Sequence, residues 1–188
     1  EICACLVGSE MCIRDSSYAV PSYIGQGTNA YTTSQLARYA TAIATSGNVY
    51  DLTLLDRQTD SKGNTLKKYE PDIINTVDVS QNVWDDIHDG MYRVVQTHRQ
   101  FDGLGVDVAG KTGTAEVNVY HPNHGMFVGY APASDPEYAI AVRIENGYTS
   151  GNACLAADDI FKYIFELTDE KSILTGVAAS DTSDTSND

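Results

Sequence analysis

Apolar residues recur at helical spacing in three segments of the chain. In residues 33–46 they fall on one helical face, where Thr32 or Thr33 can cap the start and Gly47 with Asn48 can end the helix. A second helix is predicted from Ser80 to about Thr97, with a buried stripe of Val83, Trp84, Ile87, Met91, Val94 and Val95. A third is predicted over residues 152–167, with Leu155, Ile160, Tyr163, Ile164 and Leu167 facing a sheet.

Between these helices the pattern changes to that of strands. Residues 51–59 and 65–69 predict a hairpin around the turn at 60–64. Three further strands are predicted at residues 106–120, 125–130 and 138–144. The segments between these three are too short for crossover helices, so the strands should form an antiparallel meander. The fold class expected is therefore α+β, an antiparallel sheet covered by helices.

Composition limits the classes of partner. The chain has 188 residues, 26 acidic against 12 basic, a formal charge of -14 and 42% hydrophobic residues, as expected for one soluble globular domain. The few basic residues are scattered, which makes a nucleic-acid-binding face a poor expectation. No stretch approaches the roughly 18 apolar residues of a membrane span.

Both ends of the chain are set apart from this domain. Residues 11–16 back-translate to a sequence resembling a transposase-type sequencing adapter, so residues 1–16 are interpreted as an artefact of that kind and left out of the fold. Residues 175–188 are rich in Ser, Thr and Asp and predict a disordered acidic tail. We therefore interpret residues 17–174 as the folded domain and expect it to be the C-terminal part of a longer protein.

The sharpest chemical signal is the tract Ala109-Gly110-Lys111-Thr112-Gly113-Thr114-Ala115. Residues 105–112 satisfy the pattern G-x-x-x-x-G-K-T of a phosphate-binding loop. Such a loop must follow a buried strand and open a helix, whereas here β-branched residues alternate after Thr112 and the preceding residues 97–103 are polar. A P-loop nucleotide hydrolase is thus disfavoured, and the other interpretation is the Lys-Thr-Gly element of penicillin-reactive serine enzymes.

The neighbouring blocks extend this second interpretation. They are Gly25-Gln26-Gly27, Thr33-Ser34-Gln35-Leu36-Ala37, Ala44-Thr45-Ser46-Gly47, Gly90-Met91, Val108 to Ala115, Phe127 to Pro132 and Pro136 to Ile140. In this order they resemble the transpeptidase domain of penicillin-binding proteins, particularly the class B cell-wall D,D-transpeptidases, across nearly all of residues 23–167. The resemblance implies an incomplete serine β-lactamase/transpeptidase-like fold.

The resemblance also implies a reaction and its partners. The family acts on D-Ala-D-Ala stem peptides of peptidoglycan through a serine acyl-enzyme, without metal or cofactor, and β-lactams inhibit it covalently. Cell-wall synthesis proteins are possible partners. The location implied is the extracytoplasmic face of a bacterial cell membrane, with the anchor outside this chain.

Site residues follow from the same resemblance. Lys111 would supply positive potential and a hydrogen bond to a neighbouring serine, and the hydroxyls of Thr112 and Thr114 would bind the substrate carboxylate. The backbone N–H of Thr114 would be an oxyanion donor. Gly113, without a side chain, would let the substrate backbone lie alongside the strand.

Two further elements of the family pattern do not match. No Ser-x-x-Lys nucleophile tetrad occurs in the 188 residues. Two matches to Ser-x-Asn, at Ser46-Gly47-Asn48 and Ser150-Gly151-Asn152, are both in the wrong order, and we interpret the first as a helix stop and the second as a helix cap. The nucleophile is therefore expected upstream, and this polypeptide alone is expected to be inactive.

Several alternatives remain open at this point. A β-lactam sensor, a β-lactamase or a D,D-carboxypeptidase would share the Lys-Thr-Gly element, and a non-catalytic cell-wall binding module would share the fold. His121 and His124 could suggest a metal, but they flank Pro122-Asn123 and are interpreted as residues of a hairpin turn.

Overall fold

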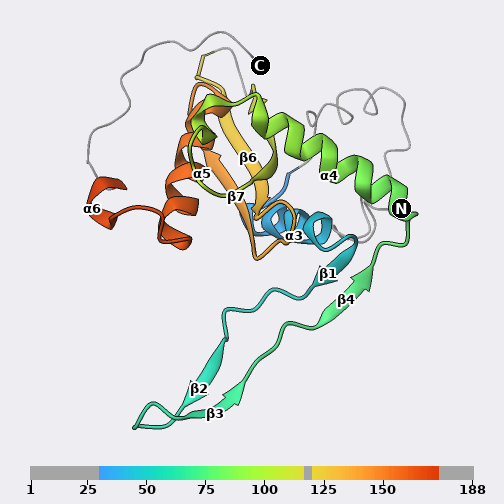
Figure 1. The fold of residues 1–188 in the computed structure, drawn as a ribbon, viewed down its shortest axis with the longest axis vertical. Coiled ribbons are helices and arrows are strands. Elements are labelled where there is room, and N and C mark those ends of the chain that lie inside the picture. The colour runs from blue at the N-terminus through green and yellow to red at the C-terminus, as the bar shows by residue number, and fades with distance from the viewer. Residues whose placement is uncertain (1–29, 117–119, 174–188) are drawn as a thin grey trace.

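The core of the molecule is a three-stranded antiparallel sheet with helices against it (Figure 1). The computed structural model describes residues 30–116 and 120–173. The strands are β5 (Ala109–Ala115), β6 (His124–Ala131) and β7 (Tyr138–Ile144), in the order β5-β6-β7. The predicted meander and the α+β class are confirmed, although β5 is shorter than residues 106–120.

Helices α3 (Thr33–Ala44) and α4 (Gln81–Gln96) pack against one side of the sheet. They surround Tyr130 of β6 and Ala109 of β5 in one hydrophobic cluster. Both helices were predicted. Thr32 closes a capping box at the start of α3, and Gly47 ends the turn after it with φ 109°. The helix-stop interpretation of Ser46-Gly47-Asn48 is thereby confirmed.

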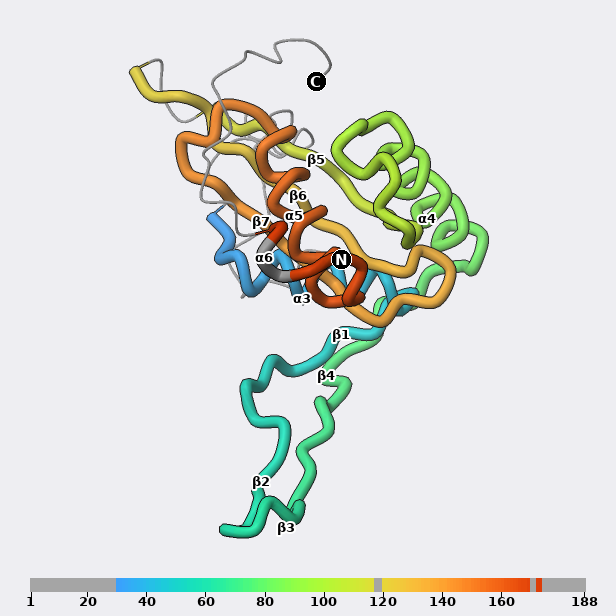
Figure 2. Tube along the Cα trace, turned by 60° about the vertical axis from the view of Figure 1, so that its left-hand side comes forward, coloured from blue at the N-terminus to red at the C-terminus, as the bar shows by residue number. Residues whose placement is uncertain are grey.

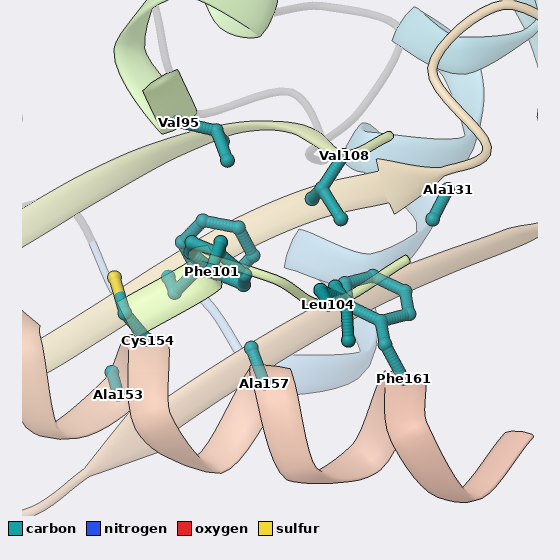
Figure 3. Packing of buried hydrophobic residues seen from close by; sticks show 10 residues of the cluster. Val95, Phe101, Leu104, Val108, Ala131, Ala153, Cys154, Ala157 and Phe161 are labelled. Atoms are coloured by element: carbon teal, nitrogen blue, oxygen red, sulfur yellow. The ribbon is translucent and has the colours of Figure 1, made fainter. Parts of the chain in front are cut away.

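Helix α5 (Ser150–Ile164) covers the other side of the sheet, but with a different face from the one predicted. Its buried residues are Ser150, Ala153, Cys154, Ala157, Asp158 and Phe161, and Figure 3 shows the apolar ones directed at Phe101, Leu104 and Val108. The predicted contacts Leu155, Ile160, Tyr163 and Leu167 are exposed instead. The buried face of α5 consists largely of small residues, which allow a helix backbone to pack closely against a sheet, whereas the prediction placed the larger apolar side chains there.

A long hairpin arm projects from this body (Figures 1 and 2). At its base β1 (Asn48–Tyr50) pairs with β4 (Ile73–Thr76), and at its tip β2 (Arg57–Thr59) pairs with β3 (Thr65–Lys68). The predicted hairpin around residues 60–64 is confirmed, but the predicted strand at 51–59 is regular only over its last three residues. The pairing at the base of the arm was not predicted.

Two short elements complete the described chain: the 3-10 helix η1 (Arg99–Phe101) and helix α6 (Glu170–Ile173). Across residues 30–116 and 120–173, none of the helices combines the length and hydrophobicity needed to cross a bilayer. The predicted artefact at residues 1–16, the Gly25-Gln26-Gly27 turn and the predicted tail at 175–188 lie outside the described residues.

Candidate functional site

The tract Lys111-Thr112-Gly113-Thr114 lies extended within β5, at the edge of the sheet. Among the described strands β5 pairs only with β6, where Lys111 is opposite Val128 and Thr114 is opposite Gly125. The tract neither forms a loop nor opens a helix, which is what a phosphate-binding loop requires. The geometry therefore excludes the P-loop interpretation and leaves an edge strand against which an extended ligand can lie.

Alternation along β5 sends neighbouring side chains of the tract to opposite sides of the sheet. Ala109 belongs to the cluster on the α3 and α4 side, so Lys111 and Gly113 share that side. Thr114 faces the other way and meets the start of α5, so Thr112 shares the α5 side. The predicted cation and the two predicted hydroxyl groups are thus on opposite faces of one edge strand.

Packing explains one glycine of β5 but not the other. A Cβ atom added at Gly110 would lie 2.4 Å from the Phe127 ring, which is far inside van der Waals contact. At Gly113 the nearest heavy atom is the Met126 Cβ at 3.6 Å, an ordinary contact distance. The described protein would therefore accept a side chain at Gly113, whereas Gly110 is required by the core.

Lys111 is exposed, and its Nζ donates to the backbone oxygen of Thr112 at 2.8 Å. Because that bond is made to the adjacent residue and leaves the ammonium group in solvent, it contributes little to stability. Of the two Ser-x-Asn serines considered from the sequence, Ser46 follows the end of α3 and Ser150 begins α5, and neither is assigned as the serine that the family pattern places beside this lysine. The predicted role of Lys111 stays a prediction.

The hydroxyl of Thr114 accepts a hydrogen bond from the backbone N–H of Ser150 at 3.2 Å. Ser150 is the first residue of α5 and is 1% exposed, while Thr149 holds the N-cap position. The prediction that Ser150-Gly151-Asn152 caps this helix is therefore wrong by one residue. Sequence patterns gave no signal for the bond itself, because it joins residues 36 positions apart.

His124 is buried and begins β6, opposite Ala115, whereas His121 is exposed. The His124 Nδ1 accepts the backbone N–H of Asn146 at 3.0 Å, so the ring fixes the loop between β7 and α5. The prediction that both histidines belong to the turn is thus wrong for His124, because strand pairing begins one residue earlier than expected. The described residues contain no group of three or more His, Cys, Asp or Glu side chains arranged to hold a metal ion.

Two buried groups away from the tract have shifted titration. Burial raises the pKa of Tyr130 to about 12. Burial also raises the pKa of Asp158 on α5, and the hydrogen bond from Lys162, one helical turn on, opposes that shift. Neither group lies in the Lys111–Thr114 tract, so we assign both to the core.

A groove of about 520 Å³ lies at the base of the arm rather than beside the tract. It is formed by residues of α3, the arm, the β6–β7 turn and the start of β7, including Leu52, Leu54, Tyr69 and Tyr138. None of the tract residues lines it. We place the candidate site at the β5 edge because the chemically distinctive residues are there, and treat the groove as a consequence of the projecting arm.

Comparison with known proteins gives the family. Residues 15–166 match the penicillin binding protein transpeptidase domain. The chain is 33% identical over 159 residues to peptidoglycan D,D-transpeptidase MrdA of Acinetobacter baumannii, covering 74% of this chain and 23% of that protein. It is 31% identical over 144 residues to penicillin-binding protein 2B of Streptococcus pneumoniae, covering 66% and 21%.

A solved structure agrees with these sequence relatives. Penicillin-binding protein A from M. tuberculosis, as an imipenem acyl-enzyme complex, matches with a TM-score of 0.69 and 26% identity over 84% of this chain and 35% of that one. The chain thus spans about a quarter of the length of the first relative and about a third of that structure. The edge strand, the flanking helices and the matched sequence together show that this chain belongs to the penicillin-binding protein transpeptidase family.

Proposed function

We propose that the protein containing this chain is a peptidoglycan D,D-transpeptidase that acts on D-Ala-D-Ala stem peptides through a serine acyl-enzyme. Its place of action would be the extracytoplasmic face of the bacterial cell membrane, with β-lactams as covalent inhibitors and cell-wall synthesis proteins as partners. The observation that carries the proposal is the Lys111–Thr114 tract, which lies extended at the edge of the sheet formed by the described strands, in a chain of this family.

The tract can seat a peptide that ends in a carboxylate. A substrate backbone lying along the β5 edge would pass Gly113. The described residues leave space there for a Cβ atom, and because glycine has none, that space is available to the ligand. The hydroxyls of Thr112 and Thr114 would hold the terminal carboxylate, and the Thr114 N–H would stabilise the oxyanion of the tetrahedral intermediate. Lys111 would supply positive potential from the other face of the strand.

The serine that forms the acyl-enzyme would come from outside the 188 residues, since they contain no Ser-x-x-Lys. In the reaction its oxygen would attack the carbonyl carbon of the penultimate D-Ala, and the terminal D-Ala would leave with a proton as the free amino acid. The amine of a second stem peptide would then attack the carbonyl carbon of the acyl-enzyme, the bond to the serine oxygen would break, and a proton lost by the amine would be balanced by the one that restores the serine hydroxyl. The residues of β5 would bind and orient the first peptide in both steps.

Labelling of the full-length protein with a fluorescent penicillin tests this proposal. We expect a covalent adduct on the full-length protein and none on the 188-residue chain. Lys111→Ala should slow labelling by about 10- to 100-fold, the effect of losing a hydrogen bond made by a charged group. Arg93→Ala removes an exposed cation on α4 and serves as the control.

Two results would contradict the proposal. Absence of labelling of the full-length protein would remove penicillin reactivity, and an equal rate for Lys111→Ala and Arg93→Ala would remove the role of Lys111. A labelled protein that releases its penicillin within one cell generation, or hydrolyses D-Ala-D-Ala peptides without transfer, would instead be a β-lactamase or a carboxypeptidase of this fold.

A further inference from the structure

The start of α5 is tied directly to the substrate-binding tract. The N–H of Ser150 donates to the Thr114 Oγ1, the hydroxyl that the proposed function assigns to the substrate carboxylate. The two residues come from different elements, and neither the catalytic pattern nor the proposed reaction uses Ser150.

The helix end is a fixed point because α5 is firmly packed. Ala153, Cys154, Ala157 and Phe161 are each 0% exposed and hold the helix against β6 and η1 (Figure 3). A helix leaves its first N–H groups without partners inside the helix, and here the side chain of the N-cap residue makes no capping bond. The Thr114 hydroxyl, which belongs to strand β5, accepts one of these N–H groups, that of Ser150.

The loop that leads into α5 is also held in place. Asn146 donates its N–H to His124, and the Asn152 side chain donates to the backbone oxygen of Gly147 at 2.8 Å. The Thr149 oxygen packs so closely on β6 that a Cβ atom at Gly125 would lie 2.3 Å from it. These contacts fix the position from which Ser150 reaches Thr114, which is opposite Gly125 in the sheet.

Accepting this bond restricts the Thr114 side chain without using its donor. A threonine hydroxyl carries one donor hydrogen and two acceptor lone pairs, so it can accept from Ser150 and donate to a carboxylate at the same time. The Ser150 N–H selects one χ1 rotamer, which removes side-chain entropy that ligand binding would otherwise have to remove.

We propose that Ser150, through its main-chain N–H, is the positioning residue for Thr114, and that the start of α5 thereby sets the affinity of the tract for the ligand carboxylate. The proposal rests on the proposed function. It makes the β7–α5 junction part of the substrate site although no side chain of that junction need touch the substrate.

Proline substitution removes this donor selectively. Ser150 occupies the first helical position, where proline is well accepted, and Thr149 is extended with φ -136° and ψ 162°, as a residue before proline must be. Ser150→Pro therefore deletes the N–H with the helix retained. Ser150→Ala is the matched control, because it removes the side-chain hydroxyl and keeps the N–H.

The measurement is the second-order rate of acylation of the full-length protein by benzylpenicillin, with the melting temperature followed in parallel. We expect Ser150→Pro to acylate about 5- to 10-fold more slowly than Ser150→Ala, the effect of about one neutral hydrogen bond. In a Thr114→Val background the same proline should make no further difference, because the acceptor is already gone.

Three outcomes overturn the inference: equal rates for the proline and alanine variants, a loss of rate that persists in Thr114→Val, or a loss that follows the melting temperature alone. Should Ser150→Pro prove too unstable to purify, amide hydrogen exchange at Ser150 tests the same bond. Acylation should slow that exchange in the wild type and not in Thr114→Val, and equal exchange in both would overturn the inference.

The result separates the two proposals. If the wild-type full-length protein forms no penicillin adduct, the proposed function fails before Ser150 is tested. If it forms the adduct and the proline and alanine variants behave alike, the function stands and the role of Ser150 is wrong.

Discussion

The sheet body and the hairpin arm use apolar residues in opposite ways. In the body, Phe127 and Tyr130 of β6 are 0% exposed between α5 on one side and α3 with α4 on the other. In the arm, Leu54 is 104%, Leu55 61% and Leu66 64% exposed. Similar strand patterns thus led to a packed layer in one region and to an exposed ribbon in the other, because the helices among the described residues cover the strands of the body and not those of the arm.

Local hydrogen bonding organises the arm in place of burial. The Asp60 carboxylate accepts the N–H groups of Lys62 and Asn64 and the Asn64 side chain, and these bonds lower the pKa of Asp60. The tip is therefore a defined turn on two short strands. The body depends on tertiary packing, and its substitutions should cost far more.

The largest expected difference is between one aromatic residue in the body and one leucine in the arm. Phe127→Ala should lower the free energy of unfolding by about 3–5 kcal/mol, because it opens a cavity between α5 and the sheet. Leu54→Ala should change it by less than about 0.5 kcal/mol. Urea unfolding of the full-length protein measures both, and a comparable loss for the two would show that the arm is buried against another part of the protein.

The two glycines of β5 give the next largest effect within the body. Gly110→Ala should lower the free energy of unfolding by about 1–3 kcal/mol, since its Cβ would overlap the Phe127 ring. Gly113→Ala should leave the unfolding free energy nearly unchanged and slow penicillin acylation. If Gly113→Ala instead destabilised the protein with normal acylation, the glycine would serve packing and not the ligand.

A smaller effect is expected at the hydroxyl of Tyr130, which has no hydrogen-bond partner among the described residues. Tyr130→Phe should raise the free energy of unfolding near neutral pH by about 1 kcal/mol, because it removes an unsatisfied buried polar group. The comparison with the wild type by urea unfolding is direct. A loss of stability would mean that the hydroxyl has a partner in the complete protein.

The same substitution has a pH dependence of known sign. The pKa of Tyr130 is raised from 10.0 to about 12, so above about pH 10 the unfolded chain loses this proton while the folded protein keeps it. The tyrosine therefore costs the folded state stability as pH rises towards 12. The advantage of Tyr130→Phe should grow from about pH 9 to about pH 11, and a constant difference would contradict the shifted pKa.

The smallest effect is expected from shortening the arm. Replacing residues 57–68 by a two-residue turn removes β2, β3 and their exposed side chains, and leaves the pairing of β1 with β4. Melting temperature and penicillin acylation should both stay close to the wild-type values. A marked loss of acylation would show that the tip acts on the site, contrary to its separation from β5 in Figure 2.

Periodicity predicted the elements well where local signals define them. Helix α3 with Thr32 and Gly47, the tip of the arm and the extended Lys111–Thr114 tract were all expected from neighbouring residues. The buried face of α5 was not predicted correctly. The large apolar residues Leu155 and Tyr163 were expected to pack on the sheet, but the alanines do so, and how closely a helix packs depends on tertiary structure that periodicity does not encode. The Ser150–Thr114 bond was missed for the same reason, since it depends on how two distant elements meet.

A crystal structure of the full-length protein acylated by benzylpenicillin would show directly whether the β5 edge binds the ligand. We expect the penicillin to lie along the β5 edge past Gly113, with its carboxylate within hydrogen-bond distance of the Thr112 and Thr114 hydroxyls and its acyl oxygen at the Thr114 N–H. A covalent adduct whose carboxylate and acyl oxygen both contact other elements would contradict this expectation.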